Sequence, residues 1–184
     1  MMDSRLSRRT LLAAGTLVAF APRAAFAAAP AVDQRFLAAL GRAPRPAQPI
    51  GDYVPVRRSG RILYLSTTTA RTDGQPDFRG ALGAELTLAQ GQQAARAAAL
   101  AMLETVYNHL GGTLAPVTQI LNMIGYVASA DGFHDQAGVM NGATAVLIEV
   151  LGADIGRSTR SAIGVKAMSR GAAVSIAATV EVAG

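Results

Sequence analysis

Arg160 is the residue of this chain whose type and position best suit the binding of a small anion. It lies in "TRSAIGVKAM", at the start of an apolar run that is typical of a β-strand. A guanidinium group in that place can hold a carboxylate through two parallel hydrogen bonds, a geometry that lysine does not offer. On the last predicted strand, Ser175 could hold a water molecule but has no pKa suited to proton transfer near neutral pH. These residues therefore allow binding of a small carboxylate and weaken the case for acid–base catalysis.

Other kinds of catalytic chemistry have little support in the composition. The chain has no cysteine, which excludes thiol chemistry and disulfides. Its two histidines, His109 and His134, do not have the spacing of paired metal ligands, so no zinc site is expected. Both are predicted to lie near helix ends in structural or solvated positions. No metal and no organic cofactor is predicted.

Residues 1–27 have the features of a twin-arginine-type export signal. Arg8-Arg9 precedes an apolar run over residues 11–21, and Ala-Phe-Ala at residues 25–27 offers a cleavage site between small residues. The run is shorter than the about 20 residues that span a bilayer, so we expect cleavage and a periplasmic or secreted protein without a stable membrane anchor. The alternative is an amphipathic membrane anchor that stays attached.

The charge of the remaining chain gives no reason to predict binding to nucleic acid. The whole sequence has 184 residues, 17 of them basic and 12 acidic, which is enough for one domain with a core. The predicted signal contains four of the basic and one of the acidic residues, which leaves 13 and 11 and a net charge of +2. No run of basic residues occurs either.

An N-terminal arm, residues 28–50, is predicted to precede a domain formed by residues 51–184. A short helix is expected over residues 33–40, since Gly41 can end it and the prolines that follow keep the chain extended.

Five strands are expected in the domain. Two apolar runs flank "RRSGR" and indicate a β-hairpin within residues 53–67. The glycines, prolines and aspartates of residues 69–85 indicate a loop. A third strand is expected over residues 117–129, and the last two over residues 160–168 and 172–182, on either side of "SRG". In the final strand, valine, isoleucine and alanine alternate with more polar residues.

Two amphipathic helices are predicted between these strands. The first begins at Thr87, where Gln90 completes a capping box, and the second is capped by Asp131. Glu104 and Glu149 are expected to face solvent. The predicted apolar stripes are Ala95, Ala98, Ala99, Met102, Val106 and Leu110 in the first helix, and Phe133, Ala137, Met140, Thr144, Leu147, Ile148 and Leu151 in the second.

The order β-β-α-β-α-β-β predicts an α+β domain, with a single mixed sheet and two helices packed on one face. Gly138 and Gly142 weaken the second helix by about 1 kcal/mol each relative to alanine, but they allow close packing. The other face of the sheet is half polar and needs a cover, for which oligomerisation is the simplest source.

Several phrases of the sequence resemble the Rid family, the reactive intermediate deaminases with a chorismate-mutase-like fold. They are "IGDYVP", "YVASADGF", "VMNGA", "NGATAVLIEVLG" and "TRSAIGV", taken together with the β-β-α-β-α-β-β order. The resemblance covers residues 33–184. It implies a homotrimer with three ligand pockets between subunits, and hydrolysis of 2-imino or enamine acids to 2-oxo acids and ammonia.

The resemblance also implies roles for individual residues. Arg160 matches the arginine that clamps the substrate carboxylate, Tyr53 matches a pocket-lining tyrosine, and Asn141 matches a helix asparagine that contacts the pocket. Ser-Gly-Gln of the family is replaced by "STTT", so that Thr67 and the next threonine make that pocket wall bulkier. The glutamate of the last strand is replaced by Ser175.

The residues and the resemblance leave three candidate functions for this protein. The first is an exported Rid-like deaminase that uses Arg160 and Ser175. The second is a non-catalytic trimer that binds a small carboxylate, and the missing glutamate favours it. RNA cleavage or translation inhibition, which relatives have been named for, is opposed by the near-neutral charge and the export signal.

Overall fold

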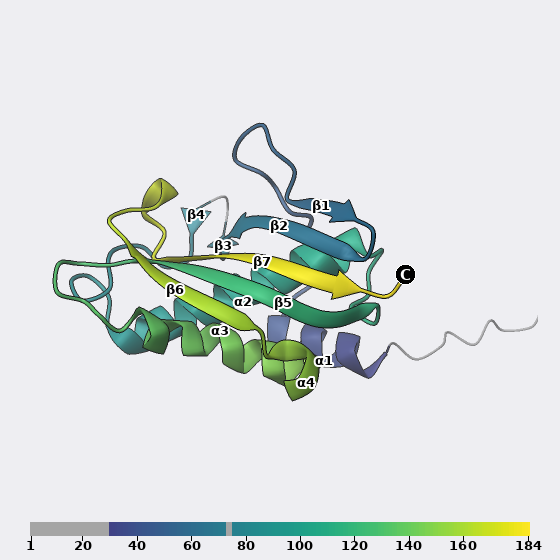
Figure 1. Ribbon diagram of the computed structural model, residues 1–184. Helices are drawn as coiled ribbons and strands as arrows, with labels where there is room; N and C mark the ends of the chain where they lie inside the picture. Colours follow the sequence, from purple (N-terminus) through teal and green to yellow (C-terminus); the bar gives the residue numbers. More distant parts are fainter. Residues whose placement is uncertain (1–29, 73–74) are drawn as a thin grey trace, which may run out of the picture.

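The computed structural model describes residues 30–72 and 75–184. The predicted export signal, residues 1–27, lies outside the described residues. Figure 1 shows a five-stranded sheet with the helices packed on one face and the other face bare. Within the described part of the chain, none of the helices combines the length and apolar character needed to cross a membrane.

The elements follow the predicted order with three small additions, the β3–β4 hairpin, the short helix α4 and a single 3₁₀ turn. Their bounds are α1 (Ala31–Leu40), β1 (Val56–Ser59), β2 (Ile62–Thr68), β3 (Arg71–Thr72), β4 (Gln75–Pro76), α2 (Leu88–His109), β5 (Val117–Ala128), α3 (Gln136–Leu151), α4 (Ala153–Gly156), β6 (Thr159–Val165), the 3₁₀ turn Ser169–Gly171, and β7 (Val174–Val182). The segment predicted as a loop thus contains β3 and β4, which pair with each other outside the main sheet.

The sheet is mixed, as predicted. Its strand order is β1-β2-β7-β5-β6, and only β5 and β6 run parallel. Strand β7 therefore pairs between β2 and β5, although β6 precedes it in the sequence. This crossover leaves β6 at the edge of the sheet, where one side of its backbone pairs with none of the strands that the structure describes.

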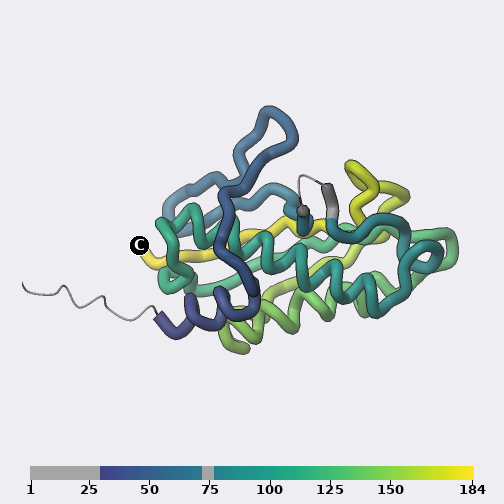
Figure 2. The backbone as a smooth tube through the Cα atoms, turned by 180° about the vertical axis from the view of Figure 1, so that it is seen from behind, coloured from purple at the N-terminus to yellow at the C-terminus, as the bar shows by residue number. Residues whose placement is uncertain are grey.

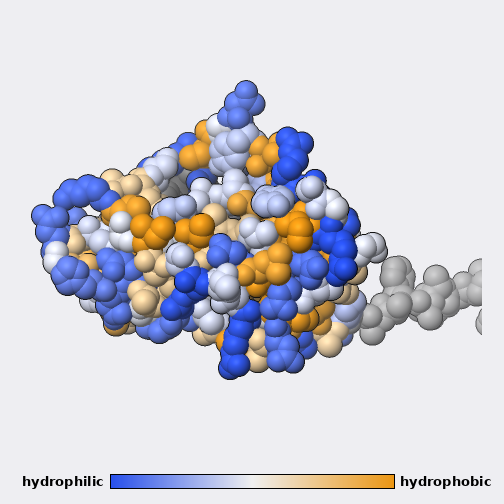
Figure 3. All heavy atoms as spheres, in the orientation of Figure 1, coloured by the Kyte–Doolittle hydropathy of each residue, from blue (hydrophilic) through white to orange (hydrophobic). Residues whose placement is uncertain are grey.

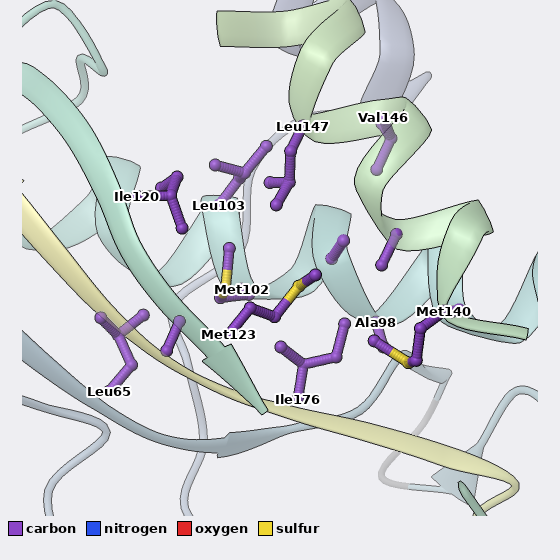
Figure 4. Close-up of a cluster of buried hydrophobic side chains, with 14 of the residues drawn as sticks. Leu65, Ala98, Met102, Leu103, Ile120, Met123, Met140, Val146, Leu147 and Ile176 are labelled. Atoms are coloured by element: carbon purple, nitrogen blue, oxygen red, sulfur yellow. The ribbon is translucent and has the colours of Figure 1, made fainter. Parts of the chain in front are cut away.

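The core lies between the sheet and helices α2 and α3 (Figure 4). Strand β7 shows why the chain folds this way, because buried and half-buried residues alternate along its whole length. Its buried side chains, which are Val174, Ile176, Ala178, Val180 and Val182, face the helices. The alternation predicted for this strand is confirmed.

The two long helices pack closely at a glycine. The predicted capping box at the start of α2 is confirmed, since the Thr87 side chain accepts from the Gln90 backbone and the Gln90 side chain accepts from that of Thr87. In α3, Gly142 lies so near to α2 that a Cβ atom there would overlap the backbone carbonyl of Gln92. The close approach that Gly142 was predicted to allow is therefore present.

The start of α3 was predicted wrongly. Asp131 does not cap it but lies in an exposed turn, where it pairs with Lys166 at 3.3 Å. The cap is Asp135, whose Oδ1 accepts from the backbone N–H of Gly138 at 2.9 Å. The later start puts Phe133 outside the helix and leaves Ala137 exposed. The buried side of α3 consists of Val139, Met140, Ala143, Val146, Leu147, Val150 and Leu151.

Glu104 is also not where the sequence predicts it. Only 7% of the residue is exposed, and its carboxylate accepts two hydrogen bonds from the Arg42 guanidinium, at 2.6 and 2.9 Å. A third comes from the backbone N–H of Arg45 at 2.6 Å. The arm thus lies across the C-terminal half of α2 (Figure 2), where it also accepts a hydrogen bond from Asn108 through the carbonyl of Arg45. Glu149 does face solvent, and pairs with Arg96 at 2.7 Å.

A second buried carboxylate holds the first part of the arm. Asp33 of α1 is 3% exposed, and it accepts from the backbone N–H of Leu114 at 2.6 Å and from the Thr113 hydroxyl at 2.7 Å. Helix α1 begins at Ala31 rather than residue 33, and ends at Leu40 with Gly41 as its C-cap, as predicted.

We expect Asp33→Ala to lower the free energy of unfolding by about 2 kcal/mol, because it leaves the buried Leu114 N–H without its acceptor. Asp154→Ala, which removes an exposed carboxylate from α4, should change it by no more than about 0.5 kcal/mol. Urea unfolding monitored by circular dichroism measures both. Equal stability of the two variants would contradict the prediction.

Candidate functional site

A pocket of about 400 Å³ lies on the bare face of the sheet, and we call it the open-face pocket. The base is a cross-strand pair, Tyr126 of β5 opposite Ser175 of β7. Side chains from the arm, from the end of β2 and from the turn after β6 form the walls. The lining residues are Ile50, Tyr53, Thr67, Thr69, Arg71, Tyr126, Val165, Ala167, Met168, Ser169, Ala172 and Ser175.

Three of the predicted site residues meet in this pocket. Tyr53 follows the arm and remains 43% exposed. Thr67 lies where the register between β2 and β7 shifts, so that the strand bulges at the pocket wall. Beyond it, the Thr69 hydroxyl donates to the carbonyl of Val174 at 2.7 Å and ties this wall to β7 beside Ser175.

The open-face pocket offers hydroxyl groups and one cation. The hydroxyls belong to two tyrosines, two threonines and two serines, and the cation is Arg71. None of the described lining residues carries a carboxylate or an imidazole. The pocket can therefore hold an anion and orient water by hydrogen bonds, but its lining supplies no group that ordinarily acts as a base near neutral pH.

Arg160 and Asn141 lie together elsewhere, in what we call the Arg160 cluster. Nη1 of Arg160 donates to Asn141 Oδ1 at 3.1 Å and to Thr144 Oγ1 at 3.0 Å. Nη2 donates to the carbonyl of Ala137 at 3.3 Å. All three acceptors belong to α3, so the helix holds the half-buried guanidinium against the edge strand. No carboxylate of the described residues pairs with it.

Within one chain, the Arg160 cluster and the open-face pocket are separate. Arg160 is opposite the buried Met123, so its side chain lies on the helix side of β6. Val165, the part of β6 that reaches the pocket, is five residues further on, which corresponds to about 16 Å along a strand. The predicted residues therefore form two groups on opposite faces of the sheet.

The comparisons with known proteins place this chain in a family. No family model matches it. It is 37% identical over 138 residues to Protein TCP17 of Trypanosoma cruzi, and the match covers 75% of this chain and 86% of TCP17. This chain belongs to the same family as TCP17.

Solved structures agree with the fold of this TCP17-family protein. The protein Atu1372 from Agrobacterium tumefaciens, of unknown function, is 32% identical with a TM-score of 0.74, over 84% of this chain and 94% of Atu1372. RidA from the Antarctic bacterium Psychrobacter sp. PAMC 21119 is 17% identical with a TM-score of 0.50, over 77% of this chain and 97% of RidA. The predicted α+β architecture of the Rid proteins is thus confirmed.

The last strand of this TCP17-family protein contains a single carboxylate, and it lies far from the pocket. Glu181 is six residues beyond Ser175, about 20 Å along the strand. It accepts from the Thr118 hydroxyl at 2.9 Å and pairs with Arg61 at 3.1 Å. Glu181 thus has a structural role and cannot replace the glutamate that the Rid resemblance implies.

Two pocket residues of this TCP17-family protein were missed by the sequence interpretation. Arg71 lies in a segment predicted as a loop, where one more charged residue carries no signal of its own. Tyr126 could have been found, because alternation along the predicted strand over residues 117–129 puts it on the face opposite Met123. The pairing of Tyr126 with Ser175 depends on the register of β5 and β7, which the sequence does not reveal.

Proposed function

We propose that this protein hydrolyses small 2-imino or enamine acids to 2-oxo acids and ammonia, with Arg160 holding the substrate carboxylate. One observation carries the proposal: three acceptors on α3 orient the guanidinium of Arg160, and no described carboxylate neutralises it. A fixed, unpaired guanidinium has donors left for a carboxylate. The Rid-like fold supports this reaction class over others.

The chemistry needs little from the protein beyond positioning. Water adds to the imine carbon, a proton passes to the nitrogen, and the C–N bond breaks to release ammonia and leave the 2-oxo acid. The hydroxyls of Ser175 and Tyr53 can orient the water molecule. Because the described pocket lining holds no acid or base, we expect a modest acceleration, lower by about 10²–10⁴ than with a general base in place.

The site requires more than one copy of the chain. Arg160 and the open-face pocket lie on opposite faces of the sheet, so we propose that a homotrimer brings the Arg160 cluster of one protomer to the pocket of the next. Edge strand β6 and the bare face are free for such contacts. That face carries exposed Tyr64 and Ile163 among polar side chains, a mixture visible in Figure 3. We further propose that the trimer works in the periplasm or outside the cell.

A non-catalytic trimer that binds a small carboxylate is the second candidate. The absence of a carboxylate from the described lining of the open-face pocket favours it, because acid–base catalysis then has no group to use. In this case the protein would capture 2-oxo acids or related anions without converting them.

The test generates 2-iminopropanoate in situ and follows pyruvate and ammonia. We expect the wild-type protein to exceed the buffer rate by at least about tenfold and Arg160→Ala to remove that excess, since the carboxylate loses its partner. Arg157→Ala removes an exposed arginine three residues earlier and should keep full activity. Thermal unfolding of each variant shows whether it is folded.

Binding separates the two candidates when no acceleration is found. Stabilisation by 2-oxo acids in a thermal shift assay, lost in Arg160→Ala, would support the non-catalytic trimer and reject the hydrolase. If wild-type protein neither accelerates hydrolysis nor gains stability from any 2-oxo acid, both candidates are wrong.

A further inference from the structure

We infer that Arg71 selects substrates with a second anionic group, so that the preferred substrates are the 2-imino derivatives of dicarboxylic amino acids. The inference rests on the proposed function and concerns the other end of the same substrate. Arg160 takes the carboxylate next to the imine carbon, and Arg71 takes the acidic group of the side chain.

The position of Arg71 is the first reason. Its half-buried side chain lines the open-face pocket and is the one charged group among the lining residues that the structure describes. It makes no ion pair or hydrogen bond with the described residues around it. A partly desolvated guanidinium without a partner is unfavourable, and an anion in the pocket would relieve this cost.

The composition of the pocket is the second reason. Small monocarboxylic imino acids carry only a short apolar group beyond the imine carbon, and would leave Arg71 and the surrounding hydroxyls without partners. Tyr53, Tyr126 and Ser169 can each donate a hydrogen bond to an anionic oxygen beside Arg71. A bound ligand shields these groups from water, so the site discriminates against ligands that cannot pair with them. The volume of about 400 Å³ has ample room for a four- or five-carbon acid.

Ligand affinity tests this assignment independently of turnover. We would titrate wild-type protein with 2-oxoglutarate and with 2-oxobutanoate by calorimetry. A charge-assisted hydrogen bond supports a preference of about tenfold or more for the dicarboxylate. Arg71→Gln should bring the two affinities within about threefold of each other, chiefly by lowering the affinity for 2-oxoglutarate. Arg57→Gln, which changes an exposed arginine of β1 outside the pocket, should keep the preference.

Two outcomes would overturn the assignment. One is equal affinity for both acids in the wild-type protein, which includes no binding of either. The other is an Arg71→Gln variant that keeps the preference or lowers the affinity for both acids by the same factor. In either case Arg71 would not contact the second anionic group of the ligand. Loss of turnover for every imine, with the binding preference and its dependence on Arg71 intact, rejects the hydrolase and not the selection of dicarboxylates.

Discussion

Gly142→Leu is expected to lower the free energy of unfolding by about 3 kcal/mol or more. Overpacking a core usually costs about 1–3 kcal/mol, because neighbouring side chains can move aside. At Gly142 the new Cβ atom meets the backbone of α2 at Gln92, which cannot rotate away. The two helices would have to separate and open the core cluster to which Ala95 and Ala98 of α2 and Val139 and Ala143 of α3 belong. Chemical denaturation measures the change.

Ala145→Leu is the matched control for this prediction. It introduces leucine at an exposed position of the same helix, where alanine and leucine differ little in helix propensity and no overlap arises. Its stability should stay within about 0.5 kcal/mol of the wild type. A Gly142→Leu variant as stable as this control would mean that α2 and α3 do not pack closely at this glycine.

Glu104→Ala is expected to lower the free energy of unfolding by about 3 kcal/mol, because it leaves Arg42 and the backbone N–H of Arg45 without their shared acceptor. Removing one partner of a buried ion pair costs about 3–5 kcal/mol, and the low end applies because the Arg42 side chain is 36% exposed. Glu104→Gln, which retains one acceptor oxygen, should cost less. Thermal or urea unfolding resolves these differences.

Glu149→Ala provides the comparison at the surface. Glu149 also binds an arginine through two hydrogen bonds, and Arg96 lowers the pKa of its carboxyl group. Its side chain is 49% exposed, so water screens the pair and its removal should cost about 0.5 kcal/mol or less. If Glu104→Ala and Glu149→Ala lower the free energy of unfolding by the same amount, the arm does not bury Glu104 in solution.

The sequence predicted those parts of the fold that depend on local pattern. Alternation in β7 and the capping box at Thr87 each involve neighbours along the chain, and both are confirmed. Glu104 was placed wrongly because its burial depends on the arm, 59 residues earlier at Arg45, and helical periodicity cannot reveal such a cover. The cap of α3 was misplaced because Asp131 and Asp135 are equally suitable by type, and only the following turn decides between them.

The candidate site was predictable only as a set of residues. Tyr53, Thr67 and Ser175 do meet in one pocket, but Arg160 and Asn141 lie on the helix side of the sheet. The face on which each side chain lies follows from the strand register, and a shift of one residue reverses it. Arg71 belongs to the pocket because of the chain path between β2 and β4, for which the sequence offers no pattern.

The arm has a consequence for regulation. Its middle part, at Arg42 and Arg45, is fastened to α2 through Glu104, and its end supplies Ile50 and the adjoining Tyr53 to the pocket. Undocking of the arm would remove one wall of the open-face pocket. The apparent dissociation constant of a ligand in that pocket then rises in inverse proportion to the fraction of molecules whose arm is docked. By thermodynamic reciprocity, a ligand that contacts this wall stabilises the docked arm by the same coupling free energy. Ligand binding in the open-face pocket should therefore lower the rate at which a protease cuts residues 42–50.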